Sequence, residues 1–299
     1  MTTPRLAGLA PILHTPFHDD GSIDVDSFAA QVDFCIASGC DVLVFPSMAS
    51  EFYTLTDEER MELAEVAISR AGDTPVVIGV TSVIKERAAR LAAHAATAGA
   101  SAVLSMPEFP RTGSLDQTIS YFTAVSTAGL PIIFQNPNAG GSSLYGSGQL
   151  ATLLERVPAI RYIKEEGTPS GQAIGGIVSK LGARLDGVFG GSFGLNQVSD
   201  AERGAIGCMP GVGLADRQVE IQHHLDAGDI VAARAKQSEI QPVLDFMRQY
   251  PGSSEKLLMH LRGIFATDRV RDPQATALDA SATAEFRRLL SEAGIPMSR

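Results

Sequence analysis

The chain has 299 residues, of which 44% are hydrophobic and 19% charged, a composition that excludes a disordered or fibrous protein. This length accommodates one large α/β barrel or two ordinary domains. Acidic residues outnumber basic ones by 34 to 24, the net charge is −10 and no Lys/Arg-rich run offsets it, so we expect neither nucleic acid nor an anionic membrane as a partner.

Short β-rich runs alternate with longer amphipathic stretches over the first two thirds of the chain. Most of these runs are compact Val, Ile, Leu and Phe segments without strict alternation, as expected for parallel strands covered on both faces. The expected strands are residues 6–14, 41–45, 75–80, 102–106, 131–135, 160–165, 187–189 and 205–208. The expected helices between them are residues 25–38, 57–71, 85–98, 115–127, 149–156 and 170–181.

Eight strands joined by helical crossovers predict a (β/α)8 TIM barrel. A doubly wound open sheet is the alternative, but no GxGxxG motif follows an early strand. The strand pattern stops near residue 214, after which residues 219–227, 230–250, 255–264 and 281–293 have helical patterns. We therefore expect a catalytic barrel over residues 1–213 and a C-terminal helical extension, including the last barrel helix, over residues 214–299.

The cysteine and histidine content predicts no metal site. Cys35, Cys40 and Cys208 form no CxxC pair, and their small, odd number fits buried apolar side chains in a reducing compartment. The histidines show no metal-ligand spacing. The N-terminus lacks a signal-peptide pattern and no apolar segment reaches membrane-spanning length, so we expect a cytoplasmic protein.

Lys164 ends the apolar strand expected at residues 160–165, and a Gly-Thr-Pro-Ser turn follows that strand. The C-terminal ends of barrel strands carry the active site. A partly dry pocket there favours the uncharged amine that attacks a carbonyl, and the resulting imine is an electron sink that acidifies neighbouring C–H bonds. The alternative interpretation is a lysine whose stem packs on the barrel while its ammonium reaches solvent.

Two further polar residues lie near the expected position of Lys164. Glu166 is two residues further along and falls on the same side if the strand continues, whereas Glu165 faces the other way. A carboxylate beside an imine serves as an acid or a base, although Glu166 also fits an ordinary loop glutamate. Gln135 ends the neighbouring strand; it orients water or a hydroxyl but cannot carry a proton, and a simple polar strand cap is its alternative.

Three backbone segments are candidate binding elements. The turn at Ser47, Met48 and Ala49 exposes N–H groups that hold a carboxylate, or is a tight turn without a ligand. Glycines around Gly190 and Ile206 allow the backbone to approach a ligand closely. Each of these signals is also common in barrel turns.

Taken together, the segments resemble the dihydrodipicolinate synthase/N-acetylneuraminate lyase family of class I aldolases and lyases over nearly the whole chain. The resemblance rests on the order and spacing of short motifs: Thr-Pro-Phe at 15–17, Ser-Glu-Phe-Tyr-Thr-Leu at 50–55, Ile-Lys-Glu at 163–165 and Arg-Gly-Ala-Ile-Gly-Cys-Met-Pro-Gly at 203–211. It implies that Lys164 forms a Schiff base and that Ser47, Met48 and Ala49 bind the substrate carboxylate. It also implies that Gly190 and Ile206 contact substrate and that the protein is a homodimer or homotetramer.

Departures from the family pattern narrow the expected reaction. Gln135 replaces the family's tyrosine that shuttles a proton, and Met48 and Ala49 replace residues whose hydroxyls relay protons. Phe109 replaces a tyrosine that a neighbouring subunit contributes in the synthases. The arginine with which the synthases bind the carboxylate of the second substrate is missing, since its position falls near Gly140. Gln on strand five with Lys-x-Glu on strand six is similar to the 2-keto-3-deoxy-L-arabonate dehydratase branch.

The leading hypothesis is therefore a hydro-lyase that acts on a 2-keto-3-deoxy sugar acid without a metal or organic cofactor. Two alternatives remain open: a pyruvate-dependent aldolase or dihydrodipicolinate synthase-like condensation, and a 2-keto acid-binding paralogue without turnover.

Overall fold

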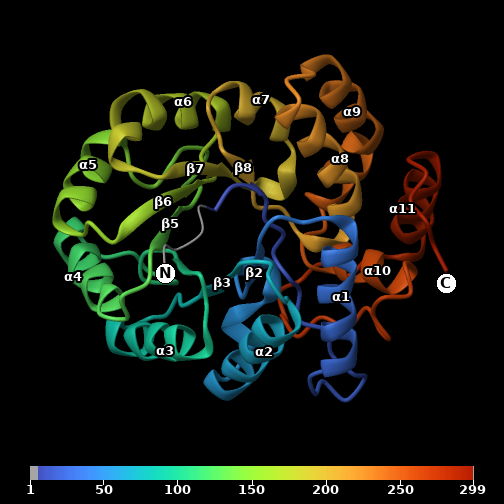
Figure 1. The fold of residues 1–299 in the computed structure, drawn as a ribbon. Helices are drawn as coiled ribbons and strands as arrows, with labels where there is room; N and C mark the ends of the chain where they lie inside the picture. The colour runs from blue at the N-terminus through green and yellow to red at the C-terminus, as the bar shows by residue number, and fades with distance from the viewer. Residues whose placement is uncertain (1–5, 299) are drawn as a thin grey trace.

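The computed structural model describes residues 6–298, and its eight strands are all parallel, with helices packed around them (Figure 1). The expectation for residues 1–5, at the start of the proposed barrel segment, lies outside the described residues. The strands are β1 (Gly8–Leu9), β2 (Leu43–Phe45), β3 (Val76–Gly79), β4 (Ala102–Ser105), β5 (Ile132–Asn136), β6 (Ile160–Glu165), β7 (Gly187–Gly190) and β8 (Gly207–Cys208).

The sheet closes on itself. Its order is β1-β8-β7-β6-β5-β4-β3-β2, and a parallel bridge between Ile12 and Val44 joins the β1 segment to β2. Ile12 also bridges to Gly211, beyond β8. The predicted (β/α)8 barrel is therefore confirmed.

The strand expected at residues 6–14 was too long: only Gly8 and Leu9 form regular ladder. Pro11 has no N–H to donate, so the ladder is interrupted there. Single bonds from Ala10 to Cys208 and from Ile12 to Pro210 continue the pairing irregularly.

The barrel helices correspond closely to the amphipathic stretches. They are α1 (Val25–Ser38), α2 (Asp57–Arg70), α3 (Lys85–Ala98), α4 (Leu115–Ser126), α5 (Ser147–Arg156), α6 (Ser170–Leu181), α7 (Gln197–Glu202) and α8 (Ala215–Asp226). A reciprocal capping box starts α2, since Thr56 Oγ1 accepts from Glu59 N–H and Glu59 Oε2 accepts from Thr56 N–H. The sequence missed α7, which is too short for a clear helical period, and placed the start of α8 four residues late.

The C-terminal region forms a second helical layer. Helices α9 (Ile230–Met247), α10 (Ser253–Leu261) and α11 (Ala280–Glu292) lie together beyond α8 (Figure 1). Their apolar core includes Phe246 and Phe286, whose rings stack with centroids 4.8 Å apart. We propose residue 213 as the boundary between the barrel and this extension.

The barrel itself is filled rather than hollow. Its interior side chains include Val44, Leu104, Tyr162 and Phe189, all buried, and a second apolar layer lies between the strands and helices. The three cysteines are buried and unbridged. Within residues 6–298, the helices are all too short or too polar to span a bilayer.

Because side chains fill the interior of the barrel, a ligand must bind at one of its ends.

Candidate active site

Lys164 and Gln135 are neighbours across the β5–β6 ladder. They are directly paired in the parallel register, and both side chains are buried, with 4% and 2% of their surface exposed. Both residues lie near the C-terminal ends of their strands, which is where barrel enzymes place reacting groups. The register therefore fixes the amine beside the amide.

A chain of polar contacts joins four residues that the sequence singled out. Lys164 Nζ lies 2.9 Å from Glu166 Oε1. The other oxygen, Glu166 Oε2, accepts a hydrogen bond of 2.8 Å from Gln135 Nε2. Gln135 Oε1 in turn accepts from Ser47 Oγ at 3.3 Å. Glu166 is thus held between the amine and the amide with its carboxylate directed at Lys164.

Glu165 faces the opposite side of the strand. Its carboxylate accepts hydrogen bonds from Asn136 Nδ2, Ser143 Oγ and Gly167 N–H. Burial raises the pKa of Glu165, opposed by these bonds. This residue fastens the turns after β5 and β6 and takes no part in the Lys164 contacts.

Gly191 makes room for the Lys164–Glu166 pair. A Cβ atom at this position would lie 2.8 Å from Glu166 Cγ and 3.1 Å from Lys164 Cε. Contacts this close to carbon atoms require one of the two side chains to move. The absence of a side chain at residue 191 is therefore needed for the ion pair in its observed position.

The turn after β2 presents donors to the same region. Ser47 starts a short 3-10 turn, Met48–Ser50, with its own N–H bonded to Ser50 Oγ. Among the described residues, the N–H groups of Met48 and Ala49 have no hydrogen-bond acceptor. Free N–H groups at the start of a helical turn suit an anionic oxygen.

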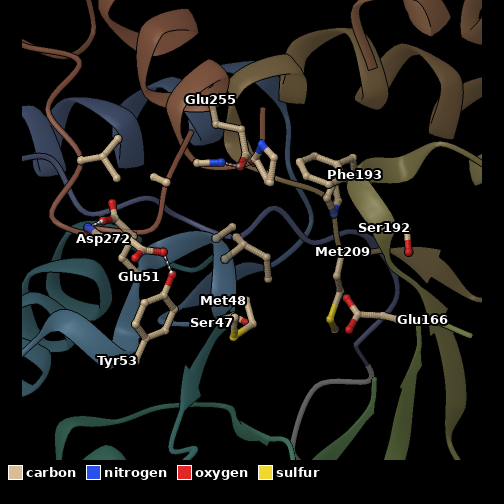
Figure 2. Close-up of a pocket in the computed structure, with 18 of the residues that line it drawn as sticks. Ser47, Met48, Glu51, Tyr53, Glu166, Ser192, Phe193, Met209, Glu255 and Asp272 are labelled. Atoms are coloured by element: carbon tan, nitrogen blue, oxygen red, sulfur yellow. Dashed lines mark hydrogen bonds between the residues drawn. The ribbon is translucent and has the colours of Figure 1, made fainter. Parts of the chain in front are cut away.

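A cavity of about 470 Å³ lies above these residues, between the end of the barrel and the helical extension. Lys164, Glu166, Ser47, Met48 and Ala49 all line it. Figure 2 shows that Glu166 and Ser192 lie on one wall, that Glu51, Tyr53 and Asp272 lie on the opposite wall, and that Glu255 lies above them. A wider hollow of about 960 Å³ shares Met48, Glu166, Ser192 and Phe193 with it.

Gly190 and Ile206 lie beneath the cavity. Gly190 pairs with Glu165 and Cys208, and a Cβ there would meet the carboxylate of Asp200. Ile206 packs against the barrel interior. Among the described residues, the cavity lining at this point comes instead from Ser192, Phe193 and Met209.

Two departures from the family pattern lie at the wider hollow. Phe109 lines it and stacks on Tyr53 of the same chain, with centroids 5.9 Å apart. Gly140 lies in the exposed turn after β5. Neither residue lines the cavity that contains Lys164.

Sequence reasoning assigned no role to the polar groups at the far end of the cavity. Glu255 is 2% exposed and lies 3.6 Å from His14 Nε2, while Glu51 pairs with Lys256 at 2.7 Å. Burial raises the pKa of Glu255 to about 7 and lowers the pKa of His14 to about 4. These residues are far apart in the chain and meet only because α10 folds against the barrel.

The end of the barrel thus holds a buried amine, an adjacent carboxylate and a cavity, the arrangement of a TIM-barrel enzyme site. The dihydrodipicolinate synthetase family profile matches residues 5–293, so the chain belongs to this family, and the family prediction is confirmed. It is a lyase of that family.

Similar proteins carry more than one activity. The chain is 28% identical to an L-2-keto-3-deoxyarabonate dehydratase of Azospirillum brasilense, over 91% of this chain and 90% of the relative. It is also 28% identical to a 4-hydroxy-tetrahydrodipicolinate synthase of Agrobacterium fabrum, over 96% and 98%. A dihydrodipicolinate synthase structure from Rhodopseudomonas palustris superposes with a TM-score of 0.89 at 27% identity, covering 97% of this chain and 99% of the other. Equal identity to a dehydratase and a synthase leaves the reaction to be argued from the site.

Proposed function

We propose that the protein is a Schiff-base hydro-lyase that removes water from a 2-keto-3-deoxy sugar acid. The observation that carries this proposal is the Lys164–Glu166 contact of 2.9 Å inside the cavity. A buried amine next to a single carboxylate supplies both the nucleophile and the proton carrier that such an elimination needs.

Glu166 accounts for the protons of the first step. Its Oε1 takes a proton from the Lys164 ammonium, and the freed amine attacks the C2 carbonyl of the keto acid. The carbinolamine then loses its hydroxyl as water with the proton that Glu166 returns. This leaves an imine on Lys164 and an ionised Glu166.

The same carboxylate serves the elimination. It removes a proton from C3, giving an enamine, and donates that proton to the departing C4 hydroxyl. One C–H and one C–O bond break, one water leaves, and hydrolysis of the imine frees Lys164. With a 2-keto-3-deoxypentonate, loss of the C4 hydroxyl leaves a C3–C4 unsaturated imine. Loss of a proton from C5 and of the C5 hydroxyl proton, with protonation at C3 and C4, then isomerises it, and hydrolysis releases a 2-keto acid semialdehyde.

Gln135 favours dehydration over aldol cleavage. Cleavage of the C3–C4 bond needs a base for the C4 hydroxyl proton, and an amide cannot act as one. Gln135 instead donates to Glu166 Oε2 and so positions the carboxylate.

We further propose that the substrate carboxylate binds the free N–H groups of Met48 and Ala49, beside the Ser47 hydroxyl. Gly190 and Ile206 line neither of the two hollows among the described residues, so we propose no direct substrate contact for them. No metal or organic cofactor is required by this reaction, and a homodimer or homotetramer and a cytoplasmic location remain our proposals.

Product analysis with 2-keto-3-deoxypentonates tests the reaction. We expect semialdehyde to form in step with loss of substrate. Release of pyruvate without semialdehyde would establish the aldolase alternative, and saturable binding with neither product would establish the non-catalytic paralogue.

A further inference from the structure

The far end of the cavity has polar groups that the proposed dehydration does not use. Glu255 and Glu51 line it, and His14 lies behind Glu255. One carboxylate oxygen of Glu255, Oε2, accepts a hydrogen bond of 3.1 Å from Gly252 N–H. Its other oxygen, Oε1, is buried and has no hydrogen-bond partner among the described residues.

His14 faces this free oxygen with a second unsatisfied atom. His14 Nδ1 lies 2.8 Å from the carbonyl oxygen of Ala49, so Nδ1 must carry the ring proton and donate it. The neutral ring therefore presents a lone pair at Nε2, which is also buried without a partner within the described chain. Two acceptors facing each other at 3.6 Å leave no room for a group between them, so the missing donor is a proton on Glu255 Oε1 or a hydroxyl beside the pair.

Gly211 keeps this space open. A Cβ atom at residue 211 would lie 2.3 Å from Glu255 Oε1 and 3.3 Å from His14 Cε1. Any side chain here would push Glu255 away from His14. The chain thus leaves room for Glu255 where the cavity meets the extension.

The charges at this end disfavour an anion. Among the described residues that line the cavity, Lys164 is the one with a cationic side chain, and it lies by Glu166. Lys256, beneath Glu51, is already bonded to Glu51 and to the carbonyl oxygens of Thr15 and Arg269. No ammonium hydrogen is left to receive a second carboxylate.

The charges do not favour a cation either. The negative charge of Glu51 is balanced by Lys256, and the raised pKa of Glu255 leaves it partly uncharged at neutral pH. The carboxylate of Asp272 accepts hydrogen bonds from Tyr53 Oη and Gln274 N–H. Burying an ammonium next to Ile12, Phe193 and Met209 would cost far more than burying a hydroxyl. A hydroxyl donates one hydrogen and accepts another, which matches both protonation states of Glu255.

We propose that Glu255, positioned by His14 and Gly211, binds the uncharged hydroxylated end of the substrate and thereby excludes keto acids that carry a second carboxylate. This inference rests on the proposed function, because it assumes that Lys164 fixes the keto-acid end. It assigns Glu255 as a specificity residue for sugar monoacids.

A matched pair of six-carbon acids tests the proposal: 2-keto-3-deoxyhexonate, which ends in a hydroxymethyl group, and 2-keto-3-deoxyhexarate, which ends in a carboxylate. The readout is the concentration of each acid that halves borohydride trapping of pyruvate on the protein. We expect the monoacid to compete at least ~100-fold better. Similar potencies, or no competition by the monoacid, would overturn the proposal.

Variants locate the selectivity. In Glu255→Gln the new amide can donate to a carboxylate, so the monoacid-to-diacid ratio should fall by about tenfold or more. The ratio is measured within one preparation, so partial loss of folded protein cancels. Glu285→Gln, on the exposed face of α11, is the matched control and should keep the wild-type ratio. An unchanged ratio in Glu255→Gln would contradict the assignment.

Two failures are distinguishable. If pyruvate is not trapped on Lys164, the proposed function itself is wrong. If pyruvate is trapped but the diacid competes equally well and Arg248→Gln removes that competition, the substrate end lies in the wider hollow that Arg248 lines, and only the inference about Glu255 is wrong.

Discussion

Two buried lysine–glutamate pairs lie at the same end of the barrel and differ in how completely they are bonded. Lys256 contacts Glu51 at 2.7 Å and two carbonyl oxygens, and Glu51 Oε2 accepts from the N–H groups of Arg271 and Asp272. Lys164 contacts Glu166 at 2.9 Å and faces the cavity. Their side chains are 1% and 4% exposed in the first pair, against 5% and 19% in the second.

From this difference we infer a structural role for the Lys256–Glu51 pair and a chemical role for the Lys164–Glu166 pair. All three ammonium hydrogens of Lys256 have acceptors, so this pair holds the 269–272 segment against the barrel. A pair with unused hydrogen-bond donors or acceptors next to a cavity can exchange a proton, and its amine can attack a ligand. Burial of a charged pair alone does not identify an active site; incomplete bonding beside a cavity does.

The largest effect should come from removing the reactive amine. In Lys164→Met no imine forms, and kcat/KM should fall on the order of 10⁴- to 10⁶-fold. Steady-state kinetics on a keto-acid substrate measures this. The matched control is Lys180→Met, an exposed lysine in the last turn of α6 that should leave turnover unchanged. A residual activity within 100-fold of wild type would remove Lys164 from the chemistry.

Neutralising the carboxylate beside it should have the next largest effect. Glu166→Gln keeps the size of the side chain but cannot accept a C3 proton, so kcat should fall by about 10²- to 10⁴-fold. Glu155→Gln, exposed on α5, is the control. Product formation at an undiminished rate in Glu166→Gln would show that another group moves the protons.

The second pair should respond in stability instead. Lys256→Met leaves Glu51 buried without its cation, and the free energy of unfolding should fall by about 3–5 kcal/mol. Urea denaturation measures this loss. Lys236→Met, which removes surface ion pairs with Glu220 and Glu239, should cost less than ~1 kcal/mol. Equal losses in the two variants would contradict the structural assignment of Lys256.

The smallest net effect concerns the pH dependence of stability. In the folded protein the pKa of Glu255 is about 7, above its usual 4.5. The free energy of unfolding that Glu255 contributes in wild type therefore falls as the pH rises from 4.5 to 7. The pKa of His14 is lowered from 6.5 to about 4, so the free energy of unfolding that His14 contributes rises with pH over nearly the same range. The contributions of Glu255 and His14 therefore largely cancel.

Comparison of Glu255→Gln with wild type should isolate the contribution of Glu255. The unfolding free energy of the variant relative to wild type should increase from pH 4.5 to pH 7, by up to about 3 kcal/mol. Urea denaturation at several pH values measures the difference, in which other titrating groups cancel. A difference that is flat with pH would show that Glu255 is ionised throughout.

The juxtaposition of Lys164 with its polar neighbours could be predicted from the sequence because strand geometry governs it. Lys164 and Glu166 are two residues apart, and parallel strands bring Gln135 and Ser47 to the same end of the barrel. Short elements were harder to predict: Pro11 interrupts β1, and α7 is too brief for a period to emerge.

The far end of the cavity could not be predicted from local pattern. His14, Glu51 and Glu255 belong to three distant segments, and each alone fits an ordinary polar residue. Their meeting depends on how α10 packs against the barrel, which no local propensity specifies. One available signal was the glutamate at residue 51, at the end of a turn already singled out.

Trapping with pyruvate and borohydride, followed by peptide mass mapping, tests the central claim most directly. A reduced pyruvate adduct on the peptide that contains Lys164, and its loss in Lys164→Met, is the result that the bonding of the two pairs predicts. An adduct on Lys256 or on a surface lysine, or no adduct at saturating pyruvate, would contradict it.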